Sequence, residues 1–238
     1  MSFLKAEWKN LAIANYEVNP HLLKKWIPSG TVLDLWQGRC YVSLIGFMFE
    51  NTKVLGLKIP FYINFEEVNL RFYVKCFQNQ QWKRGVVFIK EIVPKKALAF
   101  IANAVYKEHY QALPMKHSSQ ELEGSKIVNY SWEINGSWHG ITVKSNLQAK
   151  GILENSEAEF ITEHYWGYTK VNDHKTFEYE VVHPKWKIYD VQDYEIRVDF
   201  ATVYGNEFKN LNFATPQSVM LAEGSEIKVK NKKALKMS

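Results

Sequence analysis

The chain has 238 residues, of which 46% are hydrophobic and 15% aromatic, and it carries a formal charge of +5 at pH 7. This length and apolar content suit one large β-sandwich or barrel, so we expect a single domain over residues 1–238. Many of the lysines lie in a basic tail at about residues 228–238, where we expect them to solvate a frayed chain end. The positive charge is therefore no reason to expect a nucleic-acid partner.

The two cysteines and the N-terminus bear on the location of the protein. Cys40 and Cys76 each lie in an apolar, strand-like run, which is typical of small buried side chains in a reducing compartment. The N-terminus carries charges where a signal peptide needs an apolar block, and no run approaches the roughly 18 apolar residues of a membrane span. We expect a cytoplasmic protein with no membrane partner, and the sequence leaves its oligomeric state open.

The first half of the chain predicts long strands and one long helix. Strand patterns occupy residues 11–18, 39–49, 67–77 and 86–93, and Asn19 and Pro20 open a short helix after the first of them. Pro94 precedes a helix predicted over residues 95–110, whose apolar side chains recur at helical spacing. We expect this helix to pack on the sheet.

The second half of the chain is less regular. Asn135 and Gly136 join strands predicted at 126–134 and 138–147, the strongest hairpin signal in the sequence. Beyond Gly151 the patterns predict short helices at 157–164 and 199–208 and strands at 176–182, 186–191 and 218–223. The predicted class is α+β, mainly β, built on antiparallel sheet.

The strand predicted at 67–77 has an unusual polar face. Its alternation places Glu67, Asn69, Arg71 and Tyr73 on one side and apolar residues on the other. An acid, an amide, a guanidinium and a phenol can all form directional bonds to a ligand. We interpret this face as the wall of a polar cavity.

Two further segments concentrate reactive side chains. Residues 163–168 include His164, Tyr165 and Tyr168, which could serve as a proton donor and acceptor beside a bound carboxylate or carbonyl, or could be core aromatics with hydrogen-bonded tips. Lys116 follows the predicted long helix; a lysine in an apolar pocket can attack a carbonyl, whereas a lysine on the surface favours the helix dipole. The seven histidines show no metal-binding spacing, and no motif requires a cofactor.

Together, residues 65–74, 85–89, 112–114 and 162–165 resemble the YqjF-like family, a domain of unknown function (number 2071). That family is grouped with the acetoacetate decarboxylase-like fold, which implies a large curved antiparallel sheet closing around a central cavity, with a few outer helices. The decarboxylase forms a Schiff base through a lysine in a Pro-Lys-Lys pattern. Here Pro114, Met115 and Lys116 stand at that place, so the residue at the nucleophile position cannot form an imine.

These observations support three functional hypotheses. In the first, the cavity holds a compact oxygen-rich or anionic molecule, carboxylate- or carbonyl-bearing, and the protein could be an enzyme without a cofactor. Its ligand-binding residues would be Asn69, Arg71, Tyr73 and Tyr168, with Arg71 as the anchor, and its catalytic residues Glu67, His164 and Tyr165. Alternatively, Glu67 and Arg71 form a structural ion pair.

The other two hypotheses belong to different classes. In the second, the protein is a Schiff-base lyase that acts on a keto acid through Lys116. In the third, the protein is a non-enzymatic interaction module that binds partners through exposed apolar area around Trp36, Trp82 or Trp186.

Overall fold

The computed structural model describes residues 2–235. Its strands are β1 (Ser2–Glu17), β2 (Val32–Leu33), β3 (Tyr41–Val54), β4 (Phe65–Gln78), β5 (Gln81–Val93), β6 (Tyr110–Ala112), β7 (Met115–Leu122), β8 (Ser125–Ile134), β9 (Ser137–Gly151), β10 (Trp166–Asn172), β11 (Lys175–Val182), β12 (Lys187–Arg197), β13 (Ser218–Lys230) and β14 (Lys233–Ala234). Its helices are η1 (Pro20–Trp26), α1 (Lys96–Tyr106), α2 (Glu157–Thr162), α3 (Phe200–Tyr204) and η2 (Asn206–Phe213). The predicted class, mainly β with a few helices, is confirmed.

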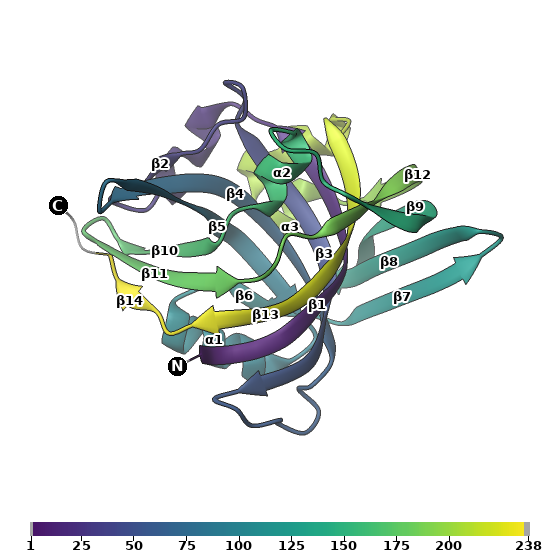
Figure 1. Cartoon of the computed structure of the whole chain (residues 1–238), viewed down its shortest axis with the longest axis horizontal. Coiled ribbons are helices and arrows are strands. Elements are labelled where there is room, and N and C mark those ends of the chain that lie inside the picture. The colour runs from purple at the N-terminus through teal and green to yellow at the C-terminus, as the bar shows by residue number, and fades with distance from the viewer. Residues whose placement is uncertain (1, 236–238) are drawn as a thin grey trace.

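Among the described residues, the strands form one 14-stranded sheet that curls back on itself (Figure 1). Its order is β14-β11-β10-β5-β4-β3-β1-β13-β12-β9-β8-β7, and an additional pairing of β11 with β13 closes the strands from β11 to β13 into a ring. The closing contact consists of two residue pairs, Val181 with Val229 and Val182 with Lys228. Two residue pairs also join β10 to β5, and these two strands run parallel. Most other neighbouring strands run antiparallel and share longer ladders.

Both faces of the central strand β4 are buried, because the ring has a core inside it and another outside it. Val68, Leu70 and Phe72 pack outward, against a cluster that includes residues of η1, β8, β9 and α3. The inner core contains aromatic side chains of β1, β3 and β4, among them Phe47 and Phe49. Successive side chains of such a strand therefore point alternately into the inner core and into the outer core. Polar side chains on the inward face are buried away from bulk water.

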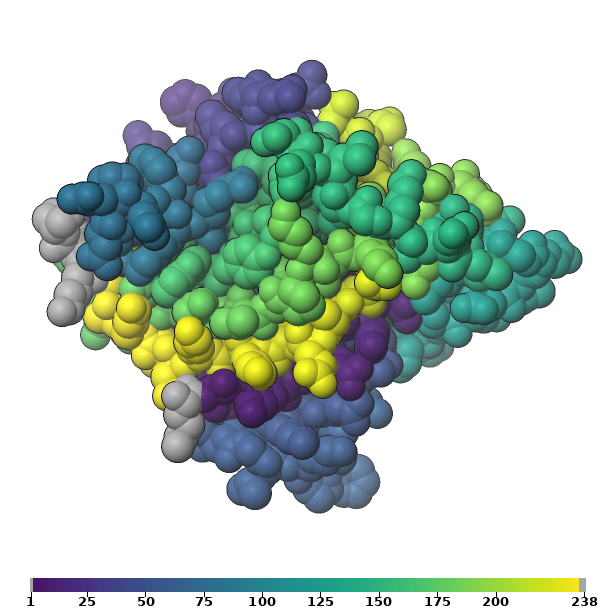
Figure 2. All heavy atoms as spheres, viewed as in Figure 1, coloured from purple at the N-terminus to yellow at the C-terminus, as the bar shows by residue number. Residues whose placement is uncertain are grey.

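The strands β7, β8 and β9 extend beyond the ring as a projecting arm, visible at the right of Figures 1 and 2. The predicted turn between β8 and β9 is present, with φ of 51° at Asn135 and 77° at Gly136. These two positive φ values are those of a type I′ hairpin turn, which asparagine and glycine adopt at low cost.

Helix α1 is shorter than predicted and covers the lower end of the ring in Figure 1 instead of packing along the sheet. It ends at Tyr106 because Lys107 adopts a left-handed conformation with φ of 62°. Only Ala99 and Tyr106 of the helix are buried, while Phe100, Ile101 and Val105 remain exposed. None of the helices formed by residues 2–235 is long and apolar enough to cross a membrane.

The prediction of a frayed basic tail is wrong for the residues that the structure describes. Lys228 and Lys230 continue β13, and the Val229 side chain between them packs with the inner core. Leu235 is buried as well, and residues 236–238 lie outside the described part of the chain. The lysines alternate with apolar residues that face the ring, so this segment is sheet.

Candidate functional site

A cavity of about 330 Å³ lies inside the ring, bounded by β1, β3, β4, β5, β10, β11 and α1. Most of its wall is apolar and aromatic, with Trp8, Phe47, Phe49, Phe65 and Trp186 among the lining residues. Polar side chains enter it from β4, β5, the segment after α1 and the segment after α2. An apolar chamber with a few convergent polar groups is the usual form of a small-molecule site.

The inward face of β4 supplies Glu67, Asn69 and Arg71, which all line the cavity and are at least nine-tenths buried. The Glu67 carboxylate accepts hydrogen bonds from Asn69 Nδ2 at 3.0 Å and from the Tyr110 hydroxyl at 3.1 Å. Arg71 Nη2 donates to the Ile161 carbonyl at 3.2 Å. Asn69 Oδ1 and Arg71 Nε are buried and have no protein partner among the described residues, so these two lining residues carry one unpaired acceptor and one unpaired donor.

Two more buried acids join Glu67 at the cavity. Glu91 lies on β5 directly across from Asn69, and Glu108 follows α1. Tyr110 hydrogen-bonds to Glu91 as well as to Glu67, and Glu108 Oε1 accepts from the hydroxyls of Thr169 at 2.5 Å and Tyr179 at 3.2 Å. The site therefore contains three buried carboxyl groups, of which Glu67 and Glu91 share the Tyr110 hydroxyl while Glu108 bonds to a separate phenol, that of Tyr179.

Burial and mutual repulsion change the proton affinity of these acids. Burial raises the pKa of Glu67 to about 7, although hydrogen bonds from Asn69 and Tyr110 and the charge of Arg71 oppose the shift. Burial, with the charge of Glu67, raises the pKa of Glu108 to about 7 as well. Burial and the charges of the other two acids raise the pKa of Glu91 well above its usual value. Near neutral pH the cluster therefore retains protons and can both donate and accept them.

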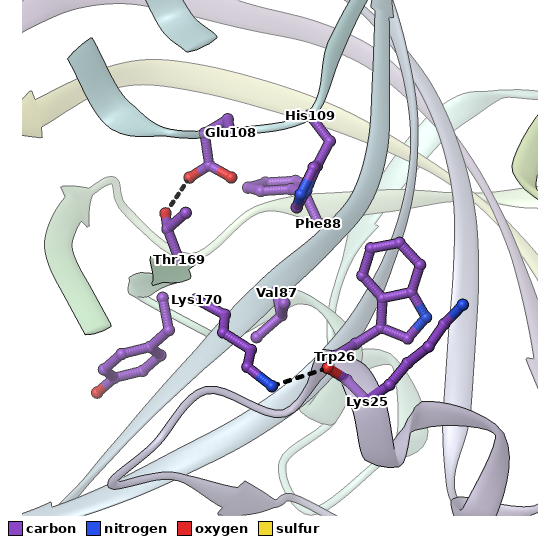
Figure 3. A pocket seen from close by; sticks show the side chains of 9 residues that line it. Lys25, Trp26, Val87, Phe88, Glu108, His109, Thr169 and Lys170 are labelled. Carbon is purple, nitrogen blue, oxygen red and sulfur yellow. Dashed lines mark hydrogen bonds between the residues drawn. The ribbon is translucent and has the colours of Figure 1, made fainter. Parts of the chain in front are cut away.

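Glu108 stands between the central cavity and a second pocket of about 280 Å³, which Figure 3 shows from close by. Phe88 is shared by both pockets, while Lys25, Trp26 and Lys170 line only the second. The Thr169 hydroxyl reaches Glu108 from β10, as the dashed line in Figure 3 marks. A carboxyl in this position can exchange protons with either pocket.

Gly167 leaves room for the Tyr179 phenol to reach Glu108. A Cβ atom at this residue would lie 2.2 Å from Cζ of the Tyr179 ring, so a larger residue would displace that ring. Tyr179 is buried and lies opposite Gly167 across the β10–β11 pair. The glycine is therefore what lets the Tyr179 ring lie across β10 and place its hydroxyl on the Glu108 carboxyl.

His164 also lines the cavity, and helix α2 positions it. Ser156 caps the helix by accepting from the Glu159 N–H at 3.2 Å, and the chain leaves the helix just before His164. His164 Nε2 lies 3.1 Å from Asp34 Oδ2, and burial lowers the pKa of the imidazole to about 4. A neutral imidazole that donates from Nε2 to a carboxylate carries its lone pair on Nδ1, and this atom has no protein partner.

The three predicted tyrosines lie outside the cavity lining. Tyr73 is buried beside the His164 ring, with ring centroids 4.7 Å apart, and its hydroxyl bonds to Ser43 at 2.7 Å. Tyr165 packs on the His183 ring and donates to Glu163. Tyr168 lines the second pocket, and its hydroxyl donates to the Lys83 carbonyl at 3.2 Å. All three phenols already have protein partners.

The structure also gives the positions of the residues named in the other two hypotheses. Lys116 is exposed on β7, in the projecting arm, where its ammonium lies 4.4 Å from the centre of the Trp138 ring. No described lysine lines the central cavity, so the geometry does not support a Schiff base there. Trp186 is buried at the cavity, whereas Trp82 is half exposed.

Two further alternatives concern charge pairing and metals. No ion pair joins Glu67 to Arg71 in the part of the chain that the structure covers, since both groups bond elsewhere. Within residues 2–235, no group of three or more histidine, cysteine, aspartate or glutamate side chains is arranged to hold a metal ion.

Sequence reasoning missed Glu91, Glu108, Tyr110 and Tyr179. Glu91 carries the one available signal, an acid inside the apolar run of β5, where burial on both faces forces it into an interior. The sequence around Glu108 does not indicate that this residue is buried, because it lies between Lys107 and His109 in a polar segment typical of a protein surface.

A closed sheet around an internal chamber with few outer helices is the architecture of the acetoacetate decarboxylase-like proteins. The structure superimposes on the enduracididine biosynthesis enzyme MppR complexed with pyruvate, with a TM-score of 0.70, 10% identity and coverage of 99% of this chain and 91% of that one. For acetoacetate decarboxylase from Legionella pneumophila the TM-score is 0.65, with 10% identity and coverage of 98% and 87%.

The chain belongs to the family of domain of unknown function 2071, an uncharacterised conserved protein family whose model matches residues 5–226. It is 24% identical over 204 residues to the uncharacterised protein YqjF of Bacillus subtilis, across 84% of this chain and 80% of that protein. The resemblance noted in the sequence is therefore confirmed, in family and in fold.

Proposed function

We propose that this protein binds a small molecule with a carboxylate or carbonyl head and an apolar body inside the ring. The observation that carries the proposal is the pair of unpartnered polar atoms, Arg71 Nε and Asn69 Oδ1, on two buried side chains at the cavity. Leaving a buried polar group unpaired costs about 1–3 kcal/mol, and a ligand that bonds to both atoms recovers this cost.

The shape and composition of the cavity favour this class of ligand. Its volume of about 330 Å³ lies at the lower end of the range for small-molecule sites. Aromatic walls suit a hydrocarbon body better than the oxygen-rich molecule expected from the sequence. Arg71 would bind the head, because a guanidinium pairs well with a carboxylate, and Asn69 would orient it. The related fold of MppR, which was solved with pyruvate, is consistent with such a head group.

The same site has groups suited to acid–base catalysis without a cofactor. Glu67 has a pKa near 7, so it can donate or accept a proton at neutral pH, and His164 Nδ1 is a free acceptor on the same cavity. In this proposal Glu67 is the catalytic acid or base, and His164 is the second one. Tyr73 packs beside the His164 ring from outside the cavity, whereas Tyr165 contacts His183 and Glu163. We also propose a cytosolic location, in keeping with the free, buried thiols of Cys40 and Cys76.

The test measures thermal unfolding with a panel of carboxylic and 2-oxo acids of increasing chain length. A ligand at 100 times its dissociation constant adds about 2.7 kcal/mol to the stability of the folded state. We expect the best acid to stabilise the wild type and the Arg197→Met control, which loses an exposed arginine, but not Arg71→Met. The proposal is wrong if no acid stabilises the wild type, or if Arg71→Met keeps the full effect.

A further inference from the structure

A group of exposed apolar side chains gathers at the end of the ring covered by α1. We call this surface the apolar rim; it comprises Leu55, Leu57 and Phe61 from the segment between β3 and β4, with Phe100, Ile101 and Val105 of α1. Phe61 is 86% exposed, Phe100 74% and Leu57 72%. The segment between β3 and β4 stands out from the lower end of the molecule in Figures 1 and 2.

Contacts join the two parts of the rim into one surface. The Leu55 N–H donates to the Phe3 carbonyl at 2.8 Å, and the Phe3 ring packs on Tyr106 of α1 with centroids 5.0 Å apart. Next to the rim, the Lys95 ammonium lies 6.0 Å from the centre of the Tyr62 ring.

The backbone indicates that two of these side chains are present for a reason other than folding. Leu55 and Phe61 adopt positive φ values of 51° and 68°. Large apolar residues are rare in this left-handed region, where glycine and asparagine are preferred. The chain therefore tolerates local strain while holding a leucine and a phenylalanine in water, which is a combination typical of a functional contact.

The charge of the rim is of one sign. Residues 51–63 and 94–107 include five lysines, Lys53, Lys58, Lys95, Lys96 and Lys107, and no aspartate or glutamate. All of them except Lys95 are exposed. A second copy of the chain is a poor occupant, since a two-fold interface would bring these lysines face to face.

The rim also continues into the central cavity. Ile59 and Tyr62 of the same segment line that cavity, as do Leu98 and Ile101 of α1. The segment and the helix that carry the rim thus also contribute one wall of the apolar chamber behind it, and Ile101 belongs to both surfaces.

We propose that the apolar rim docks on the surface of an anionic lipid bilayer. Its apolar side chains enter the boundary between headgroups and acyl chains, and its lysines lie against the anionic headgroups. The sequence predicted no membrane partner because no segment can span a bilayer, but a surface that lies on a membrane needs no span. The inference does not depend on the ligand of the cavity, because it rests on the outer face alone.

The test is flotation of the full-length protein with lipid vesicles. We expect binding to vesicles of phosphatidylcholine and phosphatidylglycerol in equal parts, and little binding to phosphatidylcholine alone. Each lysine near an anionic surface contributes about fivefold to partitioning, so Lys58→Glu with Lys96→Glu should reduce binding by about 25-fold or more. The control is Lys209→Glu, an exposed lysine on η2, which should leave binding unchanged.

A second pair of substitutions separates docking from folding. Leu55→Asn with Phe61→Asn puts asparagine where the backbone prefers it, so thermal stability should be equal or higher, while vesicle binding falls about tenfold or more. The control is Phe213→Asn, which changes a phenylalanine that is 92% exposed on η2.

Three results would overturn the inference. The first is a wild-type protein that does not bind anionic vesicles. The second is vesicle binding that remains unchanged both in the Lys58→Glu and Lys96→Glu variant and in the Leu55→Asn and Phe61→Asn variant. The third is a concentration-dependent dimer, without vesicle binding, that the Leu55→Asn and Phe61→Asn pair dissociates; this would assign the rim to a second copy of the chain.

Discussion

The substitution Glu108→Gln tests whether the acids of the cavity are protonated in the folded protein. Glutamine suits this position because Thr169 and Tyr179 both donate to the same carboxyl oxygen, Oε1. The amide carbonyl of glutamine can accept both bonds in the same place. The substitution therefore removes the titratable group and leaves its hydrogen bonds intact.

The expected magnitude follows from the raised pKa of Glu108. The folded protein holds this proton up to a pKa of about 7, whereas the unfolded chain loses it near 4.5. Because the folded state binds more protons, its stability falls as the pH rises between these values, by about 1.4 kcal/mol per pH unit and about 3 kcal/mol in total. Glu108→Gln removes this loss. It also removes a charge that raises the pKa of Glu91, which acts in the same direction.

Urea unfolding of the wild type and of Glu108→Gln, at several pH values between about 4.5 and 8, measures this effect. Relative to the wild type, the variant should gain about 3 kcal/mol across this range. The control Glu121→Gln, at an exposed position on β7, should differ from the wild type by a constant amount. A difference for Glu108→Gln that is also constant with pH would mean that the carboxyl is ionised in the folded state, and would refute the argument from burial.

Two further substitutions test the supports of the site by urea unfolding. Gly167→Ala should cost about 1–3 kcal/mol because its Cβ meets the Tyr179 ring, whereas Gly151→Ala, with no atom within 4 Å of the new Cβ, should cost about 0.5 kcal/mol or less; equal losses would contradict this. Asp34→Asn should cost about 2 kcal/mol at neutral pH, because Asp34 pairs with Arg84 at 2.6 Å and accepts from His164. Although burial opposes it, these partners hold the pKa of Asp34 well below its usual value, so its stabilising effect is present above about pH 4 and is lost as the pH falls further. A deficit that is unchanged in acid would argue against this ion pair.

The sequence predicted the polar wall of the cavity because one strand contains the whole pattern. Glu67, Asn69 and Arg71 alternate with apolar residues, and a period of two places them on one face whatever the rest of the fold. Tyr168, which was also predicted to bind the ligand, instead belongs to the outer core and lines the second pocket. Both faces of the ring strands are buried, so an aromatic residue gives no sign of which interior it enters.

The acids that complete the site depend on contacts distant in sequence. Glu91 reaches it through the register that pairs it with Asn69. Glu108 reaches it because the helix ends early, at Tyr106, and because Thr169 and Tyr179 approach from strands more than 60 residues later. The sequence marks Glu91 as an acid in a buried strand, but local patterns do not show which distant strands and loops meet, so the contacts of Glu91 and Glu108 at this site could not be predicted.

The strands of the ring are joined by ladders of very different length. Strands β1 and β3 share a long ladder, but only two residue pairs join the β10–β11 hairpin to β5, and two pairs each join it to β13 and to β14. A panel held in this way detaches locally at a lower free energy than the whole protein unfolds. Because the panel carries Thr169 and Tyr179, each such excursion separates Glu108 from both hydroxyls and lets water reach it. Local opening of this hairpin is therefore the route by which we expect the buried acids to exchange protons with bulk water.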